Sequence, residues 1–330
     1  MTYSEFLADW QSASPTLTVH TSGSTGTPKP MVVQKRRMEA SARITCRFLG
    51  LQEGDTALLC MSTDYIAGKM MAVRAIVWHL RLTVIAPTGH PLRGLTTAPD
   101  FAAMVPLQVY NSLQVPEERE LLMRIRHLII GGGAIDPDME RALQSFPNAV
   151  WSTYGMTETL SHIALRRLSG PEASVWYTPF DGVTVSLNAD RCLVIDAPAV
   201  CTQPLTTNDI AEIDSDGRRF RIIGRKDNVI CSGGIKLQIE EIETRLRPHL
   251  DVPFVITKVK DAKFGECVVL LTTADDVDAV ADICHRYLSS YERPRHYFSV
   301  DRIPTTGTGK PARAEAMHMA EDIQGRSTQM

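Results

Sequence analysis

The sequence predicts a layered α/β fold with a mainly parallel sheet, followed by a smaller α+β domain. Short apolar runs rich in β-branched residues alternate with segments of helical periodicity up to residue 153. This alternation is typical of strands and helices that build a parallel sheet. Over residues 175–223 the pattern changes to short strands and turns, which indicates an antiparallel, barrel-like section. After a boundary near residues 224–228, further strands and helices extend over roughly a hundred residues, a normal domain size.

The elements of the core follow from periodicity and from capping residues. Residues 35–49 carry apolar side chains at three- and four-residue spacing from Met38 to Leu49, which predicts an amphipathic helix. Asp136 followed by Pro137 predicts the start of another helix, because aspartate caps a helix and proline fits its first turn. The expected helices are residues 2–11, 35–49, 66–80, 117–126 and 136–146, and the expected strands are residues 17–20, 31–33, 56–61, 82–86, 127–130 and 149–153.

The chain is expected to divide into a core domain, residues 1–226, and a C-terminal domain, residues 227–330. The C-terminal domain is expected to contain helices over residues 239–247 and 277–289 and strands over residues 253–260, 266–273 and 296–301.

Composition favours a cytoplasmic protein and gives no support to a nucleic-acid or membrane partner. The formal net charge is −3, which gives no support to a nucleic acid or an anionic membrane as partner. The seven cysteines are scattered and form no Cys-x-x-Cys pair, which indicates reduced thiols. The first ten residues lack a signal-peptide pattern, and no apolar run reaches membrane-spanning length. We expect no membrane insertion, and oligomerisation is left open.

A loop rich in glycine and hydroxyl side chains lies between the first two expected strands. Glycines let backbone N–H groups point at one centre, and hydroxyls and a lysine add donors for phosphate oxygens. The loop therefore suits a polyphosphate such as ATP, although a plain surface loop is the alternative. It is not a Walker loop, which continues from Gly-Lys-Ser/Thr into a helix. The candidate residues are Thr21, Ser22, Gly23, Ser24, Thr25, Gly26 and Lys29.

A second candidate segment ends the strand that begins at residue 149. Ligands of open α/β sheets bind at the carboxyl ends of strands. Tyr154 can stack on a purine, and Thr157 can donate to a phosphate. Glu158 can hold Mg²⁺, a hard cation that prefers carboxylate and phosphate oxygens. A turn with one surface acid is the alternative interpretation.

These motifs resemble those of the adenylate-forming enzymes, which include acyl-CoA synthetases, nonribosomal adenylation domains and firefly-type luciferases. Thr-Ser-Gly-Ser-Thr-Gly-x-Pro-Lys is similar to the phosphate loop of that family, and Tyr-Gly-Met-Thr-Glu is similar to its adenine and magnesium motif. The resemblance covers roughly residues 17 to 315, in family order, and identifies a compact member in which the subdomain before the phosphate loop is almost absent. It adds Gly155 and Met156 to the nucleotide site, together with the adenine-edge turn of Gly131, Gly132, Gly133 and Ala134. A tight strand-to-helix turn is nearly as good an interpretation of those glycines, and the two are compatible.

The resemblance also implies roles in the second half of the chain. Asp209 would accept from the ribose hydroxyls, although Asn208 stands where the family has glycine. Arg225 would bind ribose, and Asp227 would be the hinge of a mobile C-terminal domain; a surface ion pair is the alternative for both.

Two further motifs complete the resemblance. The segment of Ser232, Gly233 and Gly234 would line a channel for CoA. Lys310 would be the catalytic lysine, because a compact charge on a flexible stem suits the charge that develops on a carboxylate and a phosphate.

A segment in the first half of the sequence, around residues 65–74, indicates which carboxylic acid the enzyme would use. Tyr65 replaces a histidine that is usual in the family, and Lys69 and Arg74 follow on the expected helix. An arginine at the offset of Arg74 faces the acyl pocket in o-succinylbenzoate–CoA ligases of menaquinone biosynthesis, which this chain most resembles. Lys69 and Arg74 point about 140° apart on a helix, so at most one is expected to face the pocket. The alternative is that both are solvated helix charges.

The expected activity is ligation of a carboxylic acid to CoA through an acyl-adenylate, with ATP and Mg²⁺. Thr157, Glu158 and Lys310 would be the catalytic residues, with Glu158 also the metal ligand. The alternatives are another aryl- or acyl-CoA ligase, an enzyme that adenylates an acid for a carrier protein, or a nucleotide-binding scaffold without turnover. A luciferase-like oxygenase is disfavoured because nothing in the sequence specifies oxygen chemistry.

Overall fold

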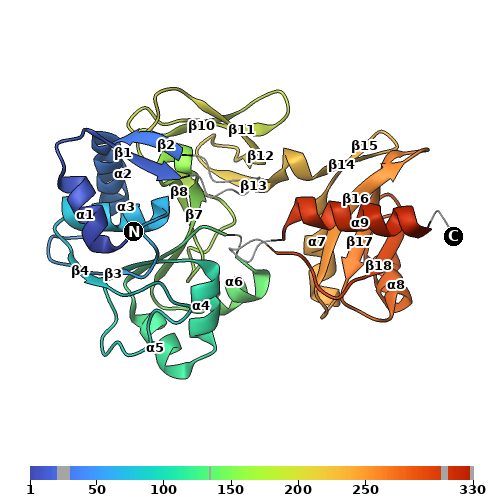
Figure 1. Cartoon of the computed structure of the whole chain (residues 1–330), viewed down its shortest axis with the longest axis horizontal. Coiled ribbons are helices and arrows are strands. Elements are labelled where there is room, and N and C mark those ends of the chain that lie inside the picture. The colour runs from blue at the N-terminus through green and yellow to red at the C-terminus, as the bar shows by residue number, and fades with distance from the viewer. Residues whose placement is uncertain (21–29, 134, 306–310, 328–330) are drawn as a thin grey trace. The chain divides into compact units, whose positions relative to one another are not determined.

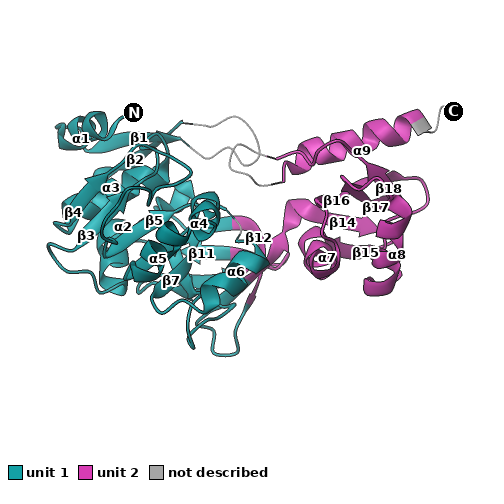
Figure 2. Cartoon of the chain, turned by 90° about the horizontal axis from the view of Figure 1, so that it is seen from below, with its two compact units in different colours: residues 1–186, 194–206, 213–221 teal, residues 187–193, 207–212, 222–330 magenta. Residues whose placement is uncertain are grey.

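The computed structural model describes residues 1–20, 30–133, 135–305 and 311–327 (Figure 1). The described chain divides into two compact units, coloured separately in Figure 2. Unit 1 comprises residues 1–186, 194–206 and 213–221, and unit 2 comprises residues 187–193, 207–212 and 222–330. The α/β fold class is confirmed.

The elements of unit 1 begin with an α-helix and a two-stranded antiparallel pair. Its helices are α1 (Tyr3–Gln11), α2 (Lys35–Phe48), α3 (Ile66–Val77), α4 (Pro106–Leu113), α5 (Pro116–Arg124), α6 (Pro137–Gln144) and the short η1 (Thr157–Thr159). Its strands are β1 (Thr16–His20), β2 (Pro30–Gln34), β3 (Thr56–Leu59), β4 (Arg81–Val84), β5 (Phe101–Met104), β6 (His127–Ile130), β7 (Ala149–Gly155), β8 (His162–Arg167) and β9 (Thr178–Pro179).

A seven-stranded sheet forms the centre of unit 1, with the order β4-β3-β5-β6-β7-β8-β9. The strands from β4 to β7 are parallel to one another, whereas β8 and β9 are antiparallel to their neighbours. The carboxyl ends of β3, β5, β6 and β7 therefore lie along one edge of the sheet, where ligands of such sheets bind.

Helices cover both faces of this sheet. Helices α2 and α3 pack against each other, and α3 contacts β3 and β4. Helices α4, α5 and α6 cover the other face and enclose a core whose side chains are buried. Alternate residues of β5 face the two layers, because Ala102 and Met104 belong to the core under α4–α6 and successive side chains of a strand point to opposite faces.

The predicted helix over residues 66–80 is three residues too long. Helix α3 ends at Val77 because His79 adopts a left-handed conformation, with φ of 53°. The Leu80 N–H then bonds to the Ala75 carbonyl over 2.9 Å, which is the hydrogen bond of a Schellman cap. Helix α2 ends in the same way after Phe48, because Gly50 has a φ of 65° and the Leu51 N–H bonds to the Cys46 carbonyl over 3.0 Å.

Several elements were not expected from the sequence. They are β5, α4, β8 and the last helix, α9 (Arg313–Ser327). Strand β5 reads Phe-Ala-Ala-Met, and alanine does not favour strands, so its burial between β3 and β6 determines its conformation.

A four-stranded sheet follows, with neighbours in chain order, and its strands contribute residues to both units. The strands are β10 (Thr184–Leu187), β11 (Cys192–Asp196), β12 (Leu205–Ile213) and β13 (Phe220–Arg225).

Unit 2 is built on a five-stranded sheet in which β17 pairs with β14, β16 and β18. Helices α7 and α8 share a core with one face, and α9 shares a core with the other. The predicted helices and strands of this part are confirmed within a few residues as α7 (Ile239–Leu246), α8 (Val277–Tyr287), β16 (Phe254–Asp261), β17 (Gly265–Thr272) and β18 (His296–Ser299). Unit 2 also contains η2 (Lys226–Asn228), β14 (Val229–Ser232), β15 (Ile235–Gln238) and η3 (Arg247–His249).

Among the described helices, none has both the length and the apolar character needed to cross a membrane.

Candidate active site

The carboxyl edge of the large sheet brings three predicted segments together. Residues 61–68, which contain Tyr65 and are called the acyl-side segment here, follow β3. Residues 131–133 follow β6, and Tyr154 lies near the end of β7. Because Ile130 pairs with Ser152 in parallel register, the glycine turn and Tyr154 leave neighbouring strands at the same edge. The acyl-side segment and the nucleotide segments are thus placed on one surface by strand order alone.

The turn after β6 contains glycine where the backbone comes close to a side chain of β7. A Cβ on Gly131 would lie 2.3 Å from the Thr153 hydroxyl oxygen, so a larger residue would require the Thr153 side chain to shift. Gly132 has a φ of 79°, which glycine adopts without strain. The turn therefore keeps backbone near the place where a purine on Tyr154 would lie, and the adenine-edge role stays a prediction.

Tyr154 belongs to an aromatic cluster inside unit 1. Its ring meets the Phe220 ring edge-on at a centroid distance of 5.0 Å and lies 5.7 Å from the Tyr177 ring. The Tyr177 hydroxyl is 2.8 Å from Ser152 Oγ, which fixes that ring in place. Such packing holds Tyr154 in one orientation, as a stacking platform for a base requires.

A tight turn follows Tyr154 and directs the side chains of Thr157 and Glu158 into different surroundings. The Met156 N–H donates to Thr159 Oγ1 over 2.9 Å, and Leu160 has a φ of 64°, a strained value for leucine. A Cβ on Gly155 would lie 2.3 Å from the carbonyl oxygen of residue 161, so glycine is required there too. As a result Thr157 is buried and the Glu158 side chain is exposed.

The residues present fit a magnesium ion held mainly by phosphates. Glu158 offers one exposed carboxylate, and no ion pair with another described residue occupies it. Within the ranges that the structure describes, no three His, Cys, Asp or Glu side chains gather as a metal cage. Magnesium is usually bound by one or two carboxylates plus phosphate oxygens and water, so a single glutamate is the appropriate ligand set.

Arg74 is buried in the core of unit 1. Its side chain is 2% exposed, and its Nη2 donates to Ser161 Oγ over 2.6 Å. Its Nε is buried and has no hydrogen-bond partner. No carboxylate among the described residues pairs with it, and burial lowers the pKa of Arg74 to about 10, so it stays protonated at neutral pH.

Lys69 and Tyr65 have surroundings that differ from those of Arg74. Lys69 is also buried, and its Nζ donates to the Thr63 carbonyl over 2.6 Å, so it closes the turn before α3. Tyr65 precedes the first residue of α3 and is 56% exposed. The alternative that Lys69 and Arg74 are solvated helix charges is therefore wrong, and the two cations have different surroundings.

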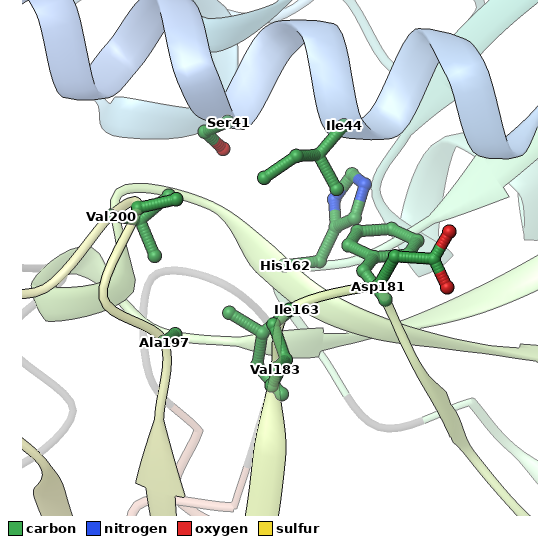
Figure 3. A pocket seen from close by; sticks show the side chains of 11 residues that line it. Ser41, Ile44, His162, Ile163, Asp181, Val183, Ala197 and Val200 are labelled. Atoms are coloured by element: carbon green, nitrogen blue, oxygen red, sulfur yellow. The ribbon is translucent and has the colours of Figure 1, made fainter.

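A small cavity lies in unit 1 between α2, β8 and the loops at residues 180–183 and 197–200 (Figure 3). Its volume of about 10 Å³ has room for about one water molecule. His162 lines it, and Tyr65, Lys69 and Arg74 do not. The cavity is far too small for a nucleotide or an aromatic acid.

Unit 2 gathers the residues predicted to meet the ribose and to form the hinge. Arg225 Nη1 donates to Asp209 over 3.0 Å, and its Nη2 donates to Asp227 over 2.8 Å. Asn208 Nδ2 lies 3.4 Å from both carboxylate oxygens of Asp227. One network thus joins Asp209, Arg225 and Asp227 with the neighbouring Asn208, and these ion pairs raise the pKa of Arg225 above its usual value despite partial burial. Their ribose and hinge roles stay predictions.

The predicted CoA segment forms a hairpin between β14 and β15. Gly233 and Gly234 have φ values of 58° and 83°, as a two-residue type I′ turn requires. Ser232 pairs with Ile235 at its base, and the Gly233 N–H donates to the Phe264 carbonyl over 2.9 Å. Glycine is needed by the turn itself, so its presence does not depend on CoA.

Some predicted residues lie outside the described part of the chain. They are the phosphate loop (Thr21, Ser22, Gly23, Ser24, Thr25, Gly26 and Lys29), Ala134 of the adenine-edge turn, and Lys310.

Comparison with known proteins identifies the family. The family model described as AMP-binding enzyme matches residues 6–198, more than half of the chain. The chain belongs to the AMP-binding enzyme family. The region matched contains the seven-stranded sheet and the turn that presents Thr157 and Glu158, and it extends into the four-stranded sheet that follows.

Curated relatives of this AMP-binding enzyme are named 2-succinylbenzoate–CoA ligase. One from Bacillus cereus is 24% identical over 92% of this chain and 70% of its own length, and one from Bacillus licheniformis is 25% identical over 88% of this chain and 67% of its own length.

Solved structures agree on the fold. An acyl-CoA synthetase (AMP-forming)/AMP-acid ligase II-like protein from Dyadobacter fermentans is 34% identical, with a TM-score of 0.65 over 96% of this chain and 92% of that one. The o-succinylbenzoate coenzyme A synthetase of Bacillus subtilis, solved with ATP and a magnesium ion, has a TM-score of 0.74 at 20% identity over 90% of this chain and 69% of that one.

Ser161 and His162 also lie at this site, although no sequence motif predicted them. Ser161 is the partner of Arg74, and the His162 ring lies 3.2 Å from Ser161 Oγ. The only signal was their position, three and four residues after Glu158 of the predicted motif.

Proposed function

We propose that this enzyme is an AMP-forming acid–CoA ligase whose acid carries a second carboxylate that pairs with Arg74. o-Succinylbenzoate is the first acid to test, because it has a succinyl carboxylate that can react and a ring carboxylate that needs a partner.

The observation that carries the proposal is the buried Arg74 guanidinium with an unpartnered Nε. A buried charge without a counter-ion is costly, so such groups are usually paired. Arginine also binds carboxylates through two parallel hydrogen bonds, which requires two free N–H groups on one side. A carboxylate from the substrate would supply the missing negative charge.

The names of the curated relatives support the same acid. Those relatives are called 2-succinylbenzoate–CoA ligases, and 2-succinylbenzoate is o-succinylbenzoate. Their identity to this chain is about a quarter, so the chemistry around Arg74 carries more weight for the acid than the names do.

The reaction proceeds in two half-reactions. The succinyl carboxylate oxygen attacks the α-phosphorus of ATP, the bond to the bridging oxygen breaks, and pyrophosphate leaves. The CoA sulfur then attacks the acyl carbon, and AMP leaves with the electron pair of the acyl–oxygen bond. Bound Mg²⁺, held by Glu158 and phosphate oxygens, would neutralise phosphate charge.

The chain's own residues position these groups. Tyr154 would stack on adenine, Thr157 would donate to the α-phosphate, and Asp209 with Arg225 would hold the ribose. Lys310 would meet the charge that develops between the carboxylate and the phosphate in the first half-reaction. Ser232, Gly233 and Gly234 would line the path of CoA in the second.

Pyrophosphate exchange with a panel of acids tests the proposal. Without CoA, the enzyme should incorporate labelled pyrophosphate into ATP with o-succinylbenzoate and much less with 3-benzoylpropionate, which lacks the ring carboxylate. Exchange only with other acids would indicate another acyl-CoA ligase or a carrier-protein adenylating enzyme. ATP binding without exchange for any acid would favour a nucleotide-binding scaffold and reject the proposal.

A further inference from the structure

Four side chains, linked by hydrogen bonds into what is called the polar relay here, run through the core of unit 1. It begins at Arg74 on α3, whose Nη2 donates to Ser161 Oγ over 2.6 Å. Ser161 Oγ lies 3.2 Å from His162 Nδ1. His162 Nε2 lies 3.1 Å from Thr45 Oγ1 on α2. Figure 3 shows the His162 ring rising from β8 toward α2.

The donor and the acceptor of each hydrogen bond in this relay follow from Thr45, the residue at the end opposite Arg74. The Thr45 hydroxyl donates its only proton to the Ser41 carbonyl over 3.2 Å, so its oxygen must accept from His162 Nε2–H. A neutral imidazole with a proton on Nε2 has a free lone pair on Nδ1, which accepts from the Ser161 hydroxyl. The Ser161 oxygen is then left to accept, and Arg74 is the donor that reaches it.

The same turn that presents Glu158 also holds Ser161. Thr159 Oγ1 donates to the Ser161 carbonyl over 2.6 Å, and the strained φ of Leu160 turns the backbone between them. A Cβ on Gly155 would collide with this carbonyl, so the position of Ser161 is determined by packed backbone. The partner of Arg74 is therefore fixed, whereas a water molecule would be free to move.

We propose that Ser161 and His162 are positioning residues that orient the Arg74 guanidinium and thereby set the preference for an acid with a second carboxylate. The inference rests on the proposed function. The relay occupies one N–H of the guanidinium and leaves the buried Nε without a partner. A guanidinium held at one corner offers its remaining donors in a single orientation, which lowers the entropy lost when a carboxylate binds.

The test compares o-succinylbenzoate with 3-benzoylpropionate in the adenylation reaction of the full chain. Ser161→Ala removes the partner of Arg74, and His162→Leu removes the group that directs the serine proton. His162→Gln is the conservative variant, since its amide has both an N–H donor group and a carbonyl acceptor. Ser169→Ala is the matched control, because Ser169 is a buried serine whose Oγ donates to the Asn148 carbonyl and lies outside the relay.

We expect Ser161→Ala to raise KM for o-succinylbenzoate about five- to tenfold, the worth of one hydrogen bond, with a much smaller change in kcat. KM for 3-benzoylpropionate should change less than twofold. His162→Leu should act in the same way and keeps the test open if Ser161→Ala fails to fold. His162→Gln should retain most of the preference, and Ser169→Ala should retain all of it.

Two results would overturn the inference alone. One is a preference for o-succinylbenzoate that survives both Ser161→Ala and His162→Leu. The other is an equal loss with both acids, which indicates a purely structural role. A parent enzyme that shows no preference between the two acids would reject the proposed function, and the positioning role with it.

Discussion

Replacing Arg74 by methionine should weaken binding of the acid and stabilise the fold. Arg74 is fully buried, and burial lowers its pKa to about 10. The ordinary arginine pKa is about 12.5, so folding costs the charged group on the order of 3 kcal/mol. Both values exceed 7, so Arg74 is protonated in the folded and the unfolded protein at neutral pH. Methionine has similar length and no charge, and the main loss is one hydrogen bond to Ser161, worth about 1 kcal/mol.

The expected net effect of Arg74→Met is an increase of about 1–3 kcal/mol in the free energy of unfolding, the difference between those terms. Urea titration of parent and variant measures it. In the same variant, loss of a hydrogen bond to a charged group, about 1.5–3 kcal/mol, should raise KM for o-succinylbenzoate roughly ten- to a hundredfold. KM for ATP should scarcely change, and the preference over 3-benzoylpropionate should shrink.

Lys69→Met is the matched control, because Lys69 is a buried cation on the same helix that donates to the Thr63 carbonyl. It should leave the preference between the two acids intact. Arg74→Met could instead destabilise the protein by several kcal/mol and raise KM equally for both acids. In that case the arginine is a structural group. Lys69 then becomes the next candidate for the carboxylate.

Four further outcomes are expected. Burial and the nearby Arg74 lower the pKa of His162. As the pH decreases below about 6.5, this histidine is therefore protonated in the unfolded chain before it is protonated in the folded one. The free energy of unfolding should then decrease by up to about 1.4 kcal/mol for each pH unit. His162→Gln should reduce that dependence in denaturant titrations between pH 5 and 6.5, and an unchanged slope would assign it to other groups. Lys310→Ala should stop acyl-adenylate formation but spare thioester formation from a pre-made acyl-adenylate; equal loss of both would reject its role. Asp227→Pro should leave adenylation largely intact and slow thioester formation, because proline fixes φ at a hinge, and a parent-like second step would exclude Asp227. Glu158→Gln should raise the Mg²⁺ concentration needed for adenylation, and an identical Mg²⁺ titration would remove Glu158 from the metal site.

The parts of the fold that the sequence predicted are those controlled by local chemistry. Asp136 caps α6 by accepting from the Asp138 N–H over 2.9 Å, as its place before a proline indicated. The glycine turn, Tyr154 and the acyl-side segment meet at one edge because each follows a parallel strand. For such features, the order of residues along the chain is sufficient.

The parts that could not be predicted depend on distant contacts. Strand β5 is alanine-rich and becomes a strand because β3 and β6 enclose it. Arg74 and Ser161 are 87 residues apart in the chain, and no local pattern pairs a helix arginine with a serine in a strained turn. The partner of His162, Thr45, lies 117 residues away. Motifs therefore indicated where a site is expected, whereas the polar relay behind Arg74 needed the three-dimensional structure.

We expect this chain to join a dicarboxylic acid to CoA through an adenylate. The direct measurement is product analysis by mass spectrometry after incubation with ATP, Mg²⁺, CoA and o-succinylbenzoate. We expect AMP and the o-succinylbenzoyl thioester of CoA in equal amounts, and the acyl-adenylate alone when CoA is omitted. Formation of ADP in place of AMP, or no thioester with o-succinylbenzoate while another acid is converted, would contradict the claim.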